Sequence, residues 1–145
     1  MIVLKDEGLY CPQGDFFIDP LLPCKNAVIT HAHADHARPG MKNYICTPET
    51  SEIMKLRISN DLLIKEVEYN NEIQINSVKI TFIPAGHVLG SSQIKIDNGS
   101  EVTIITGDYK RAIDPTCKSF EVHECDTFVT AVSYTHLRAH ETYDH

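Results

Sequence analysis

The sequence predicts an α/β domain built mainly from short strands, with polar side chains placed where several of those strands end. Three observations support this prediction. Alternating runs rich in Val, Ile, Phe and Thr recur along the chain, turn-forming residues separate them, and one segment has the features of a helix. The 145 residues are enough for one ordinary domain or for part of a larger one, and their 42% hydrophobic content is sufficient for a packed core.

The first half of the chain contains three candidate strands and the candidate helix. Thr47, Pro48 and Glu49 supply a hydroxyl, a proline and an acid, which are the residue types preferred at a helix N-terminus. We expect that helix to end near Arg57. The strands are expected at 16–18, 27–30 and 43–46.

The second half of the chain, from Ile64 onward, has the pattern of successive strands. Asn98-Gly99 lies between two alternating runs, which is a strong signal for a β-hairpin. Asn76-Ser77 is the expected turn between two earlier runs, and Pro84 ends the second of them. The strands are expected at 72–75, 78–83, 93–96, 101–105 and 126–129.

Residues 31–36, with the sequence His-Ala-His-Ala-Asp-His, form the densest group of possible metal ligands. Side chains two positions apart in an extended segment point the same way, so His31 and His33 can bind one ion. Asp35 and His36 follow directly and can face a second ion. Neutral imidazoles with a carboxylate suit zinc, with positions left open for water. A chance surface cluster of histidines is the alternative, but a compact His/Asp group after an apolar run is a ligand pattern.

Three further polar side chains also follow candidate strands. Asp19 follows the first strand, His87 comes after the run that ends at Pro84, and Asp108 comes after 101–105. Taken alone, His87 is as easily a structural histidine, and Asp108 is as easily a turn residue. Because the 31–36 cluster follows a strand as well, we expect these side chains to converge at one edge of a sheet.

Charge and cysteine content indicate the setting. The net charge of −7 weakly disfavours a nucleic-acid partner, although two divalent ions would cancel four of those charges. The five cysteines are scattered without a C-x-x-C pair, which favours a reduced, cytoplasmic location. No stretch has the length of a membrane span, and the N-terminus lacks the pattern of a secretory signal peptide.

The order of these polar residues resembles that of the metallo-β-lactamase fold, an αββα sandwich found in binuclear metal hydrolases. The resemblance covers residues 1–130, which would be the N-terminal part of such a domain, about half of the fold. It implies that three histidines hold a first zinc and that Asp35 and His36 hold a second. It also implies that Asp108 bridges the two ions and that Asp19 accepts a hydrogen bond that orients a ligand histidine. The three histidines of the first site are His31, His33 and His87.

Individual residues and short sequence strings indicate which branch of this fold the chain resembles. Asp108 stands where antibiotic-hydrolysing lactamases carry a cysteine, and His33 stands where di-iron flavoproteins carry a glutamate. Both speak against those branches. The strings at 14–20, 84–91 and 106–110 (GDFFIDP, PAGHVLGS and TGDYK) resemble the bacterial ligase-associated DNA exonucleases. That group is similar to the β-CASP-related nucleases that process mRNA 3′ ends.

The activity that this resemblance implies is phosphodiester hydrolysis by an exonuclease acting on the ends of DNA or RNA, with DNA favoured. Two zinc ions would lower the pKa of a bridging water, which Asp35 and Asp108 would orient. Arg38, Lys110 and Arg111 are candidates for holding flanking phosphates, although solvated loop cations are the simpler interpretation. The implied partners are nucleic acid, a DNA ligase and a helicase, with no membrane.

Two other functions remain open from the sequence. A small-molecule hydrolase of the same fold, such as a thioesterase or a glyoxalase-like enzyme, would share the 31–36 cluster. An inactive metal-binding fragment is the second, because the resemblance stops near Thr130. Nucleases of this kind carry an acid where Ala131 stands, and later histidines that complete the second zinc site. We expect those later residues to be missing from this chain.

Residues 131–145 are expected to be a tail that is not native to the domain. The string VSYTHLRAHET at 132–142 resembles one reading frame of a transposase-type sequencing-library adaptor, and the similarity to nucleases ends where it begins. A genuine short histidine-bearing segment is the alternative. Sequencing the locus beyond codon 130 distinguishes the two.

Overall fold

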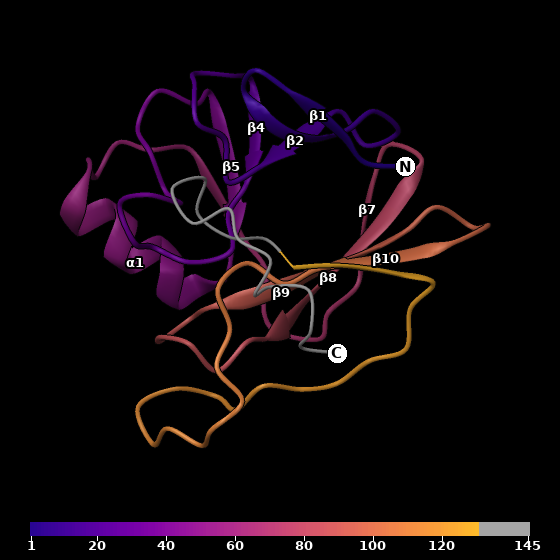
Figure 1. Ribbon diagram of the computed structural model, residues 1–145. Helices are drawn as coiled ribbons and strands as arrows, with labels where there is room; N and C mark the ends of the chain where they lie inside the picture. The colour runs from indigo at the N-terminus through magenta and orange to yellow at the C-terminus, as the bar shows by residue number, and fades with distance from the viewer. Residues whose placement is uncertain (131–145) are drawn as a thin grey trace.

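The computed structural model describes residues 1–130, which form two β-sheets and one helix (Figure 1). The tail predicted at 131–145 lies outside the described residues. The strands of the first sheet are β1 (Val3–Lys5), β2 (Gly8–Cys11), β3 (Phe16–Ile18), β4 (Asn26–Val28), β5 (Asn43–Cys46) and β6 (Ile64–Glu66), in that spatial order. The strands of the second sheet are, in spatial order, β11 (Thr127–Val129), β10 (Val102–Ile105), β9 (Ser92–Asp97), β8 (Val78–Pro84) and β7 (Ile73–Ile75).

Strand direction decides which loops meet. In the first sheet β3, β4, β5 and β6 run parallel, whereas β2 is antiparallel to both β1 and β3. In the second sheet β9 is antiparallel to β8 and to β10, so β8 and β10 point the same way. The carboxyl ends of β3 and β4 therefore share one edge of the first sheet, and those of β8 and β10 share one edge of the second.

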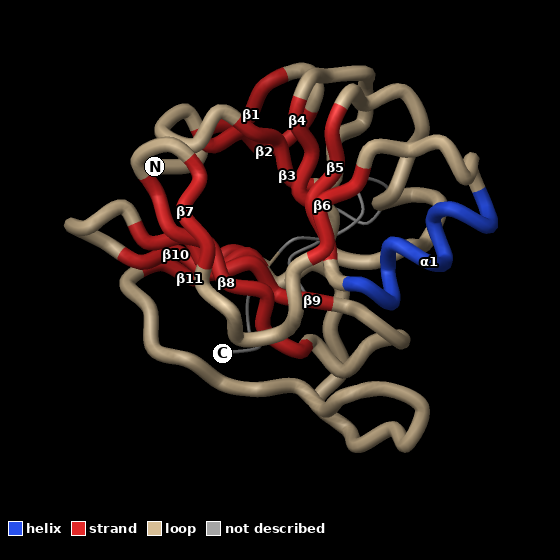
Figure 2. The backbone as a smooth tube through the Cα atoms, turned by 180° about the vertical axis from the view of Figure 1, so that it is seen from behind, coloured by secondary structure: helices blue, strands red, loops and turns tan. Residues whose placement is uncertain are grey.

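Alternate residues of the central strands face two separate hydrophobic clusters. Val28 packs between the sheets with residues such as Phe82 and Ile94. Its neighbour Ala27 faces the opposite side, where Tyr44 and Met54 are buried. Met54 belongs to α1 (Pro48–Arg57), which lies beside β5 and β6 on the outer side of the first sheet (Figure 2). The described residues therefore form a helix layer and two sheet layers.

The predicted α/β class is confirmed, and so are the bounds of the helix. The Thr47 hydroxyl caps α1 by accepting a hydrogen bond from Thr50 N, with Pro48 in the first turn. Strand β4 ends at Val28, before the predicted Thr30, because Thr30 turns out of the sheet to bond Asp19. Within residues 1–130 the structure contains no helix with the length and hydrophobicity required to cross a bilayer.

Three strands, β1, β2 and β6, have no counterpart among the strand ranges predicted from the sequence. All three residues of β1 are exposed, so the alternation that marks a half-buried strand is missing there. The strand forms because β2 offers a free edge, along which Leu4 pairs with Leu9.

Candidate metal centre

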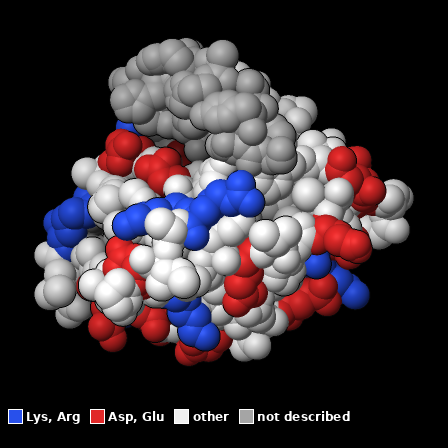
Figure 3. Space-filling view, turned by 60° about the horizontal axis from the view of Figure 1, so that its bottom comes forward, with Lys and Arg blue, Asp and Glu red and all other residues white. Residues whose placement is uncertain are grey.

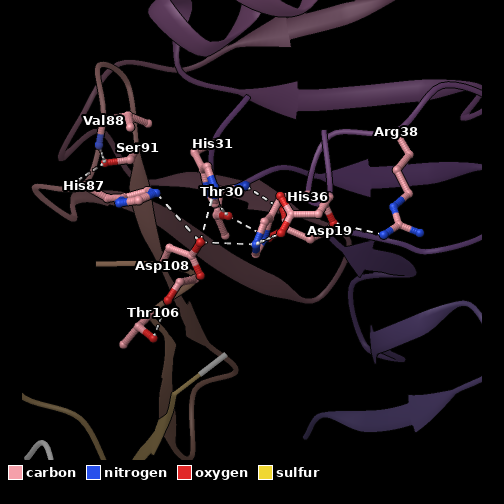
Figure 4. Close-up of polar contacts among 12 residues, drawn as sticks. Asp19, Thr30, His31, His36, Arg38, His87, Val88, Ser91, Thr106 and Asp108 are labelled. Atoms are coloured by element: carbon pink, nitrogen blue, oxygen red, sulfur yellow. Dashed lines mark hydrogen bonds and ion pairs between the residues drawn. The ribbon is translucent and has the colours of Figure 1, made fainter. Parts of the chain in front are cut away.

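Side chains from four separate segments converge where the two sheets meet (Figure 4). The 31–36 cluster follows β4 and Asp19 follows β3, both in the first sheet. His87 follows β8 and Asp108 follows β10, both in the second sheet. A hydrogen bond from Ser92 N to Thr30 O, 2.7 Å long, joins the start of β9 to the segment after β4. The site is therefore built across both sheets.

Three histidines form a nearly regular triangle. The ring centroids of His31 and His33 are 4.9 Å apart, those of His31 and His87 are 5.0 Å apart, and those of His33 and His87 are 5.1 Å apart. The ring planes are nearly perpendicular, at 81° to 86°. One nitrogen of each ring lies within 4.8 Å of the others. Ligands that share a tetrahedral zinc lie about 3.3 Å apart, so small side-chain shifts bring all three onto one ion.

A second group of possible ligands adjoins the first and shares one residue with it. His31, Asp35 and His36 each present a ligand atom within 4.8 Å of the others. The sequence assigned His31 to the first ion alone, whereas the structure places it within reach of both groups. The ring centroids of His31 and His36 are 4.2 Å apart.

Asp108 lies between the two groups of ligands (Figure 4). Its Oδ2 atom is 3.6 Å from His31 Nε2, 3.4 Å from His36 Nε2 and 3.7 Å from His87 Nε2. A ligand that is shared by two ions must lie close to the ligands of both. The Asp108 carboxylate has such a position, because it lies near nitrogens of both groups. The bridging role itself stays a prediction.

The same three nitrogens have no hydrogen-bond partner. The Nε2 atoms of His31, His36 and His87 are buried and form no hydrogen bond in the described structure. Buried polar atoms in proteins are nearly always paired, so three such atoms around one carboxylate need another explanation. A bound cation supplies it, and imidazole nitrogens with a carboxylate are donors that zinc accepts. The residues present therefore fit a metal ion.

Asp19 organises two of the histidines through its carboxylate. Its Oδ1 accepts a hydrogen bond from Thr30 N (2.8 Å), and its Oδ2 accepts from the Thr30 hydroxyl (2.6 Å). Oδ2 also lies 2.7 Å from His36 Nδ1. The Thr30 oxygen is in turn 3.0 Å from His31 Nδ1. If both Nδ1 atoms carry the proton, both Nε2 atoms present a lone pair to the site.

The sequence pointed to Asp19 but not to Thr30. The Thr30 hydroxyl connects the two residues: it donates a hydrogen bond to Asp19 and also contacts Nδ1 of His31. Its position next to the cluster was visible in the sequence, but its contact with Asp19 depends on β3 lying beside β4.

The charges of the site favour a neutral His31 and a positive charge at His36. Burial, followed by the neighbouring His36, lowers the pKa of His31 to about 3, so this imidazole is neutral at pH 7. Burial also lowers the pKa of His87. Burial acts in the same direction on His36, but Asp108 and Asp19 outweigh it and raise the pKa of His36 to about 10. A position where two carboxylates stabilise a proton also stabilises a metal cation in its place.

The site is closed on one side and open on the other. The side chains of His31 and His36 are 0% and 6% exposed. His33 is exposed, and the side chain of Asp35 is 52% exposed. The site is therefore open to solvent on the side of His33 and Asp35, while the opposite wall is protein.

The three basic residues proposed for phosphate binding each contact another part of the chain. Arg38 reaches Asp35 O at 3.3 Å, Lys110 pairs with Asp114 at 3.4 Å, and the Arg111 guanidinium lies 5.9 Å from the centre of the Phe120 ring. In Figure 3, Lys and Arg side chains form a short band with acidic side chains on both sides. A role in phosphate binding stays a prediction.

Gly107 is required where Asp108 approaches the histidines. It has φ +58°, and a Cβ atom there would lie 2.8 Å from both Cβ and Oγ1 of Thr30. We expect Gly107→Ala to lower the free energy of unfolding by about 1–3 kcal/mol and to weaken metal binding, because Asp108 must shift. Gly99→Ala is the matched control, since Gly99 has φ +92° but no atom within 4 Å of the added methyl. Equal losses in urea denaturation for the two variants would show that the crowding at Thr30 has no effect.

No family model matches the chain, but curated proteins of several kinds are similar to it in sequence. A protein named probable DNA ligase from Opitutus terrae is 30% identical over 106 residues, which is 72% of this chain and 10% of that protein. Endoribonuclease YSH1 from Saccharomyces cerevisiae is 35% identical over 72 residues, 50% of this chain and 9% of that protein. Transcription termination factor FttA from Methanosarcina mazei is 27% identical over 168 aligned residues, 90% of this chain and 25% of that protein.

Solved structures agree with the arrangement of the strands. A metallo-β-lactamase with a HARLDQ motif from Cronobacter sakazakii matches with a TM-score of 0.55 and 16% identity, over 74% of this chain and 54% of that one. The CmlA β-hydroxylase E377D mutant matches with a TM-score of 0.58 and 16% identity, over 79% of this chain and 31% of that one. At these identities the similarity concerns the fold alone. The chain spans between about a tenth and a quarter of the length of the three curated relatives.

Proposed function

We propose that this chain, which has the metallo-β-lactamase fold and resembles the nucleases of that fold, is the metal-binding part of a zinc-dependent phosphodiester hydrolase. The observation that carries the proposal is the position of Asp108 Oδ2, 3.4–3.7 Å from three buried Nε2 atoms that have no hydrogen-bond partner. Such an arrangement suits a pair of cations that share a carboxylate.

The residues that would hold the ions are those that the sequence predicted. His31, His33 and His87 would bind the first zinc, and Asp35 and His36 would bind the second, with Asp108 between them. When bound, the ions would supply a hydroxide at neutral pH and charge neutralisation for the phosphate oxygens.

The chain's own residues prepare this chemistry in three ways. Asp19 holds His36 through its Nδ1 atom and, by way of Thr30, also His31, which directs both Nε2 atoms inward. The buried wall around His31 excludes water from one side of the site. The exposed carboxylate of Asp35 lies on the open side, where it would help to orient the attacking water.

Nucleic acid is the proposed substrate. The names of the three relatives describe a probable DNA ligase, an endoribonuclease and a transcription termination factor, all of which are proteins that work on nucleic acid. We propose an exonuclease that acts on DNA ends in the cytoplasm, together with a ligase and a helicase, and we keep RNA ends as the second candidate. Free rather than disulfide-bonded cysteines support the cytoplasmic location.

We also propose that residues 1–130 are the N-terminal part of a longer domain. The relatives are several times longer than the matched region, and the ligand groups described here contain three side chains each, one of them shared. The resemblance to these nucleases implies a further, downstream ligand for the second zinc, in addition to Asp35, His36 and Asp108.

Metal content and activity test this proposal together. After dialysis against metal-free buffer, the chain is expected to keep one zinc tightly and to bind a second weakly, and to show little or no nuclease activity. A version extended through the downstream genomic codons is expected to hold two ions and to digest DNA from its ends.

The controls for this experiment separate the competing functions. Asp108→Asn in the extended protein is expected to abolish cleavage, while the folded content measured by circular dichroism is retained. Hydrolysis of thioesters without hydrolysis of DNA or RNA would support the small-molecule hydrolase instead. Two tightly held zincs and strong DNA cleavage by the 145-residue chain would show that no further ligand is needed.

A further inference from the structure

Helix α1 contacts both of the segments that carry the site's histidines. At its N-terminal end, the hydroxyls of Thr47 and Thr50 donate hydrogen bonds to Gly90 O, over distances of 2.8 and 3.0 Å. Gly90 follows His87 by three residues. Its φ is +83°, and a Cβ atom there would lie 2.7 Å from the Thr50 hydroxyl oxygen. The His87 segment is therefore pressed directly against the first turn of α1.

At the other end of the helix, Arg57 binds the 31–36 segment. Its Nε atom donates to Ala32 O over 3.1 Å, and its Nη2 atom donates to Ala37 O. Ala32 lies between the first two histidines of the cluster, and Ala37 directly follows the last. The carbonyls of Ala32 and Ala37 therefore lie on either side of most of the candidate ligands in this segment. The planar guanidinium of Arg57 binds both carbonyls with two donors in a fixed geometry.

The helix between these contacts is a rigid spacer. It has 10 residues, and Met54 in its centre is fully buried against the first sheet. A helix of this length spans about 15 Å. The distance between the His87 segment and the 31–36 segment is therefore tied to a helix that itself carries no ligand.

We propose that Arg57 and Thr50 are positioning residues, which hold the two ligand-bearing segments at the separation that the three-histidine site requires. This inference rests on the proposed metal site. A zinc site with His31 and His33 from one segment and His87 from the other depends on that separation, because zinc tolerates ligand displacements of only a few tenths of an ångström. Loss of either contact loosens one ligand segment, although the Ser92 N to Thr30 O bond and the Thr47 bond to Gly90 remain.

The experiment measures zinc affinity by competition with a chelator, and it records the visible absorption spectrum after cobalt substitution. The variants are Arg57→Gln, Arg57→Lys and Thr50→Val in the full chain. We expect each to weaken the first zinc 10–100-fold, the range found for residues that support metal ligands. We also expect an altered cobalt spectrum. Arg57→Lys should bind zinc nearly as weakly as Arg57→Gln, because lysine keeps the positive charge but lacks the planar pair of donors.

Lys55→Gln is the matched control. Lys55 lies on the same helix, and its charge pairs with Glu66 on β6 at 4.0 Å, away from the ligand segments. We expect its zinc affinity and cobalt spectrum to equal those of the wild type. A loss in Lys55→Gln as large as in Arg57→Gln would attribute the effect to helix charge and overturn the proposal.

Measurements at low temperature separate positioning from folding. Circular dichroism first establishes that each variant is folded without metal at the temperature of the titration, and Thr50→Val tests the proposal if Arg57→Gln is not. Folded variants with wild-type zinc affinity and cobalt spectrum would overturn the inference. Failure of the proposed site itself looks different: the wild type and His87→Ala would then bind zinc equally weakly.

Discussion

Replacing His31 with alanine is expected to remove tight zinc binding from the three-histidine group and to weaken further the second group, in which His31 also lies. His31 is fully buried and is the one residue that the two groups share. Its pKa is lowered by burial to about 3, so at pH 7 it is a neutral ligand that needs no deprotonation before it binds a metal. We expect zinc affinity to fall by more than about 100-fold, the upper range for residues that merely support a ligand.

Isothermal titration with zinc measures this loss, and His123→Ala is the control. His123 is a partly exposed histidine whose Nε2 lies 3.3 Å from Glu121, and it belongs to neither ligand group. The control is expected to bind zinc like the wild type. If His31→Ala binds its first zinc with the affinity of the wild type, the site assigned here is wrong.

Asp19→Ala is expected to cause the largest loss of stability among changes at the site. The side chains of Asp19 and His36 are only 11% and 6% exposed, and the same carboxylate accepts from Thr30 N and from the Thr30 hydroxyl. Alanine removes the carboxylate at His36 Nδ1, leaving only Asp108 and Asp35 near that buried ring, and it leaves both buried donors of Thr30 without their acceptor. We expect a loss of about 3–5 kcal/mol in the free energy of unfolding.

Urea denaturation of the metal-free chain measures the effect of Asp19→Ala. Asp61→Ala removes an exposed carboxylate outside the site and is expected to change the free energy of unfolding by less than about 0.5 kcal/mol. Asp19→Asn keeps one acceptor for Thr30 N and should lose less than Asp19→Ala. Equal stability of Asp19→Ala and the wild type would mean that the three hydrogen bonds to Asp19 contribute nothing.

The elements of the fold were largely visible in the sequence because their signals are local. A capping hydroxyl, a proline and an acid predicted the start of α1 at the correct residue. Asn98-Gly99 predicted the hairpin of β9 and β10, which the structure confirms. The fully exposed strand β1 escaped prediction, because its partner across the sheet, and not its own pattern, makes it a strand.

The candidate ligands were also identified from the sequence, since each follows a strand. What their spacing did not reveal is that His31 belongs to both groups and that Asp108 lies between them. Those facts depend on how two sheets, formed by the first and second halves of the chain, meet. Arg57 gave no signal at all, because its partners Ala32 and Ala37 are far from it in the chain and accept through backbone oxygens.

The sequence by itself determined the fold class, the helix and most of the strands of residues 1–130, and the residue types available to bind a metal. These depend on hydrogen bonds and side-chain periodicity within a few residues, which a pattern in the chain expresses directly. The tertiary structure alone decided which atoms meet: Asp19 with Thr30 and His36, Thr50 with Gly90, and Arg57 with the ligand segment. Such contacts depend on the packing of a helix and two sheets, and no local pattern specifies the distance between groups that the chain holds tens of residues apart.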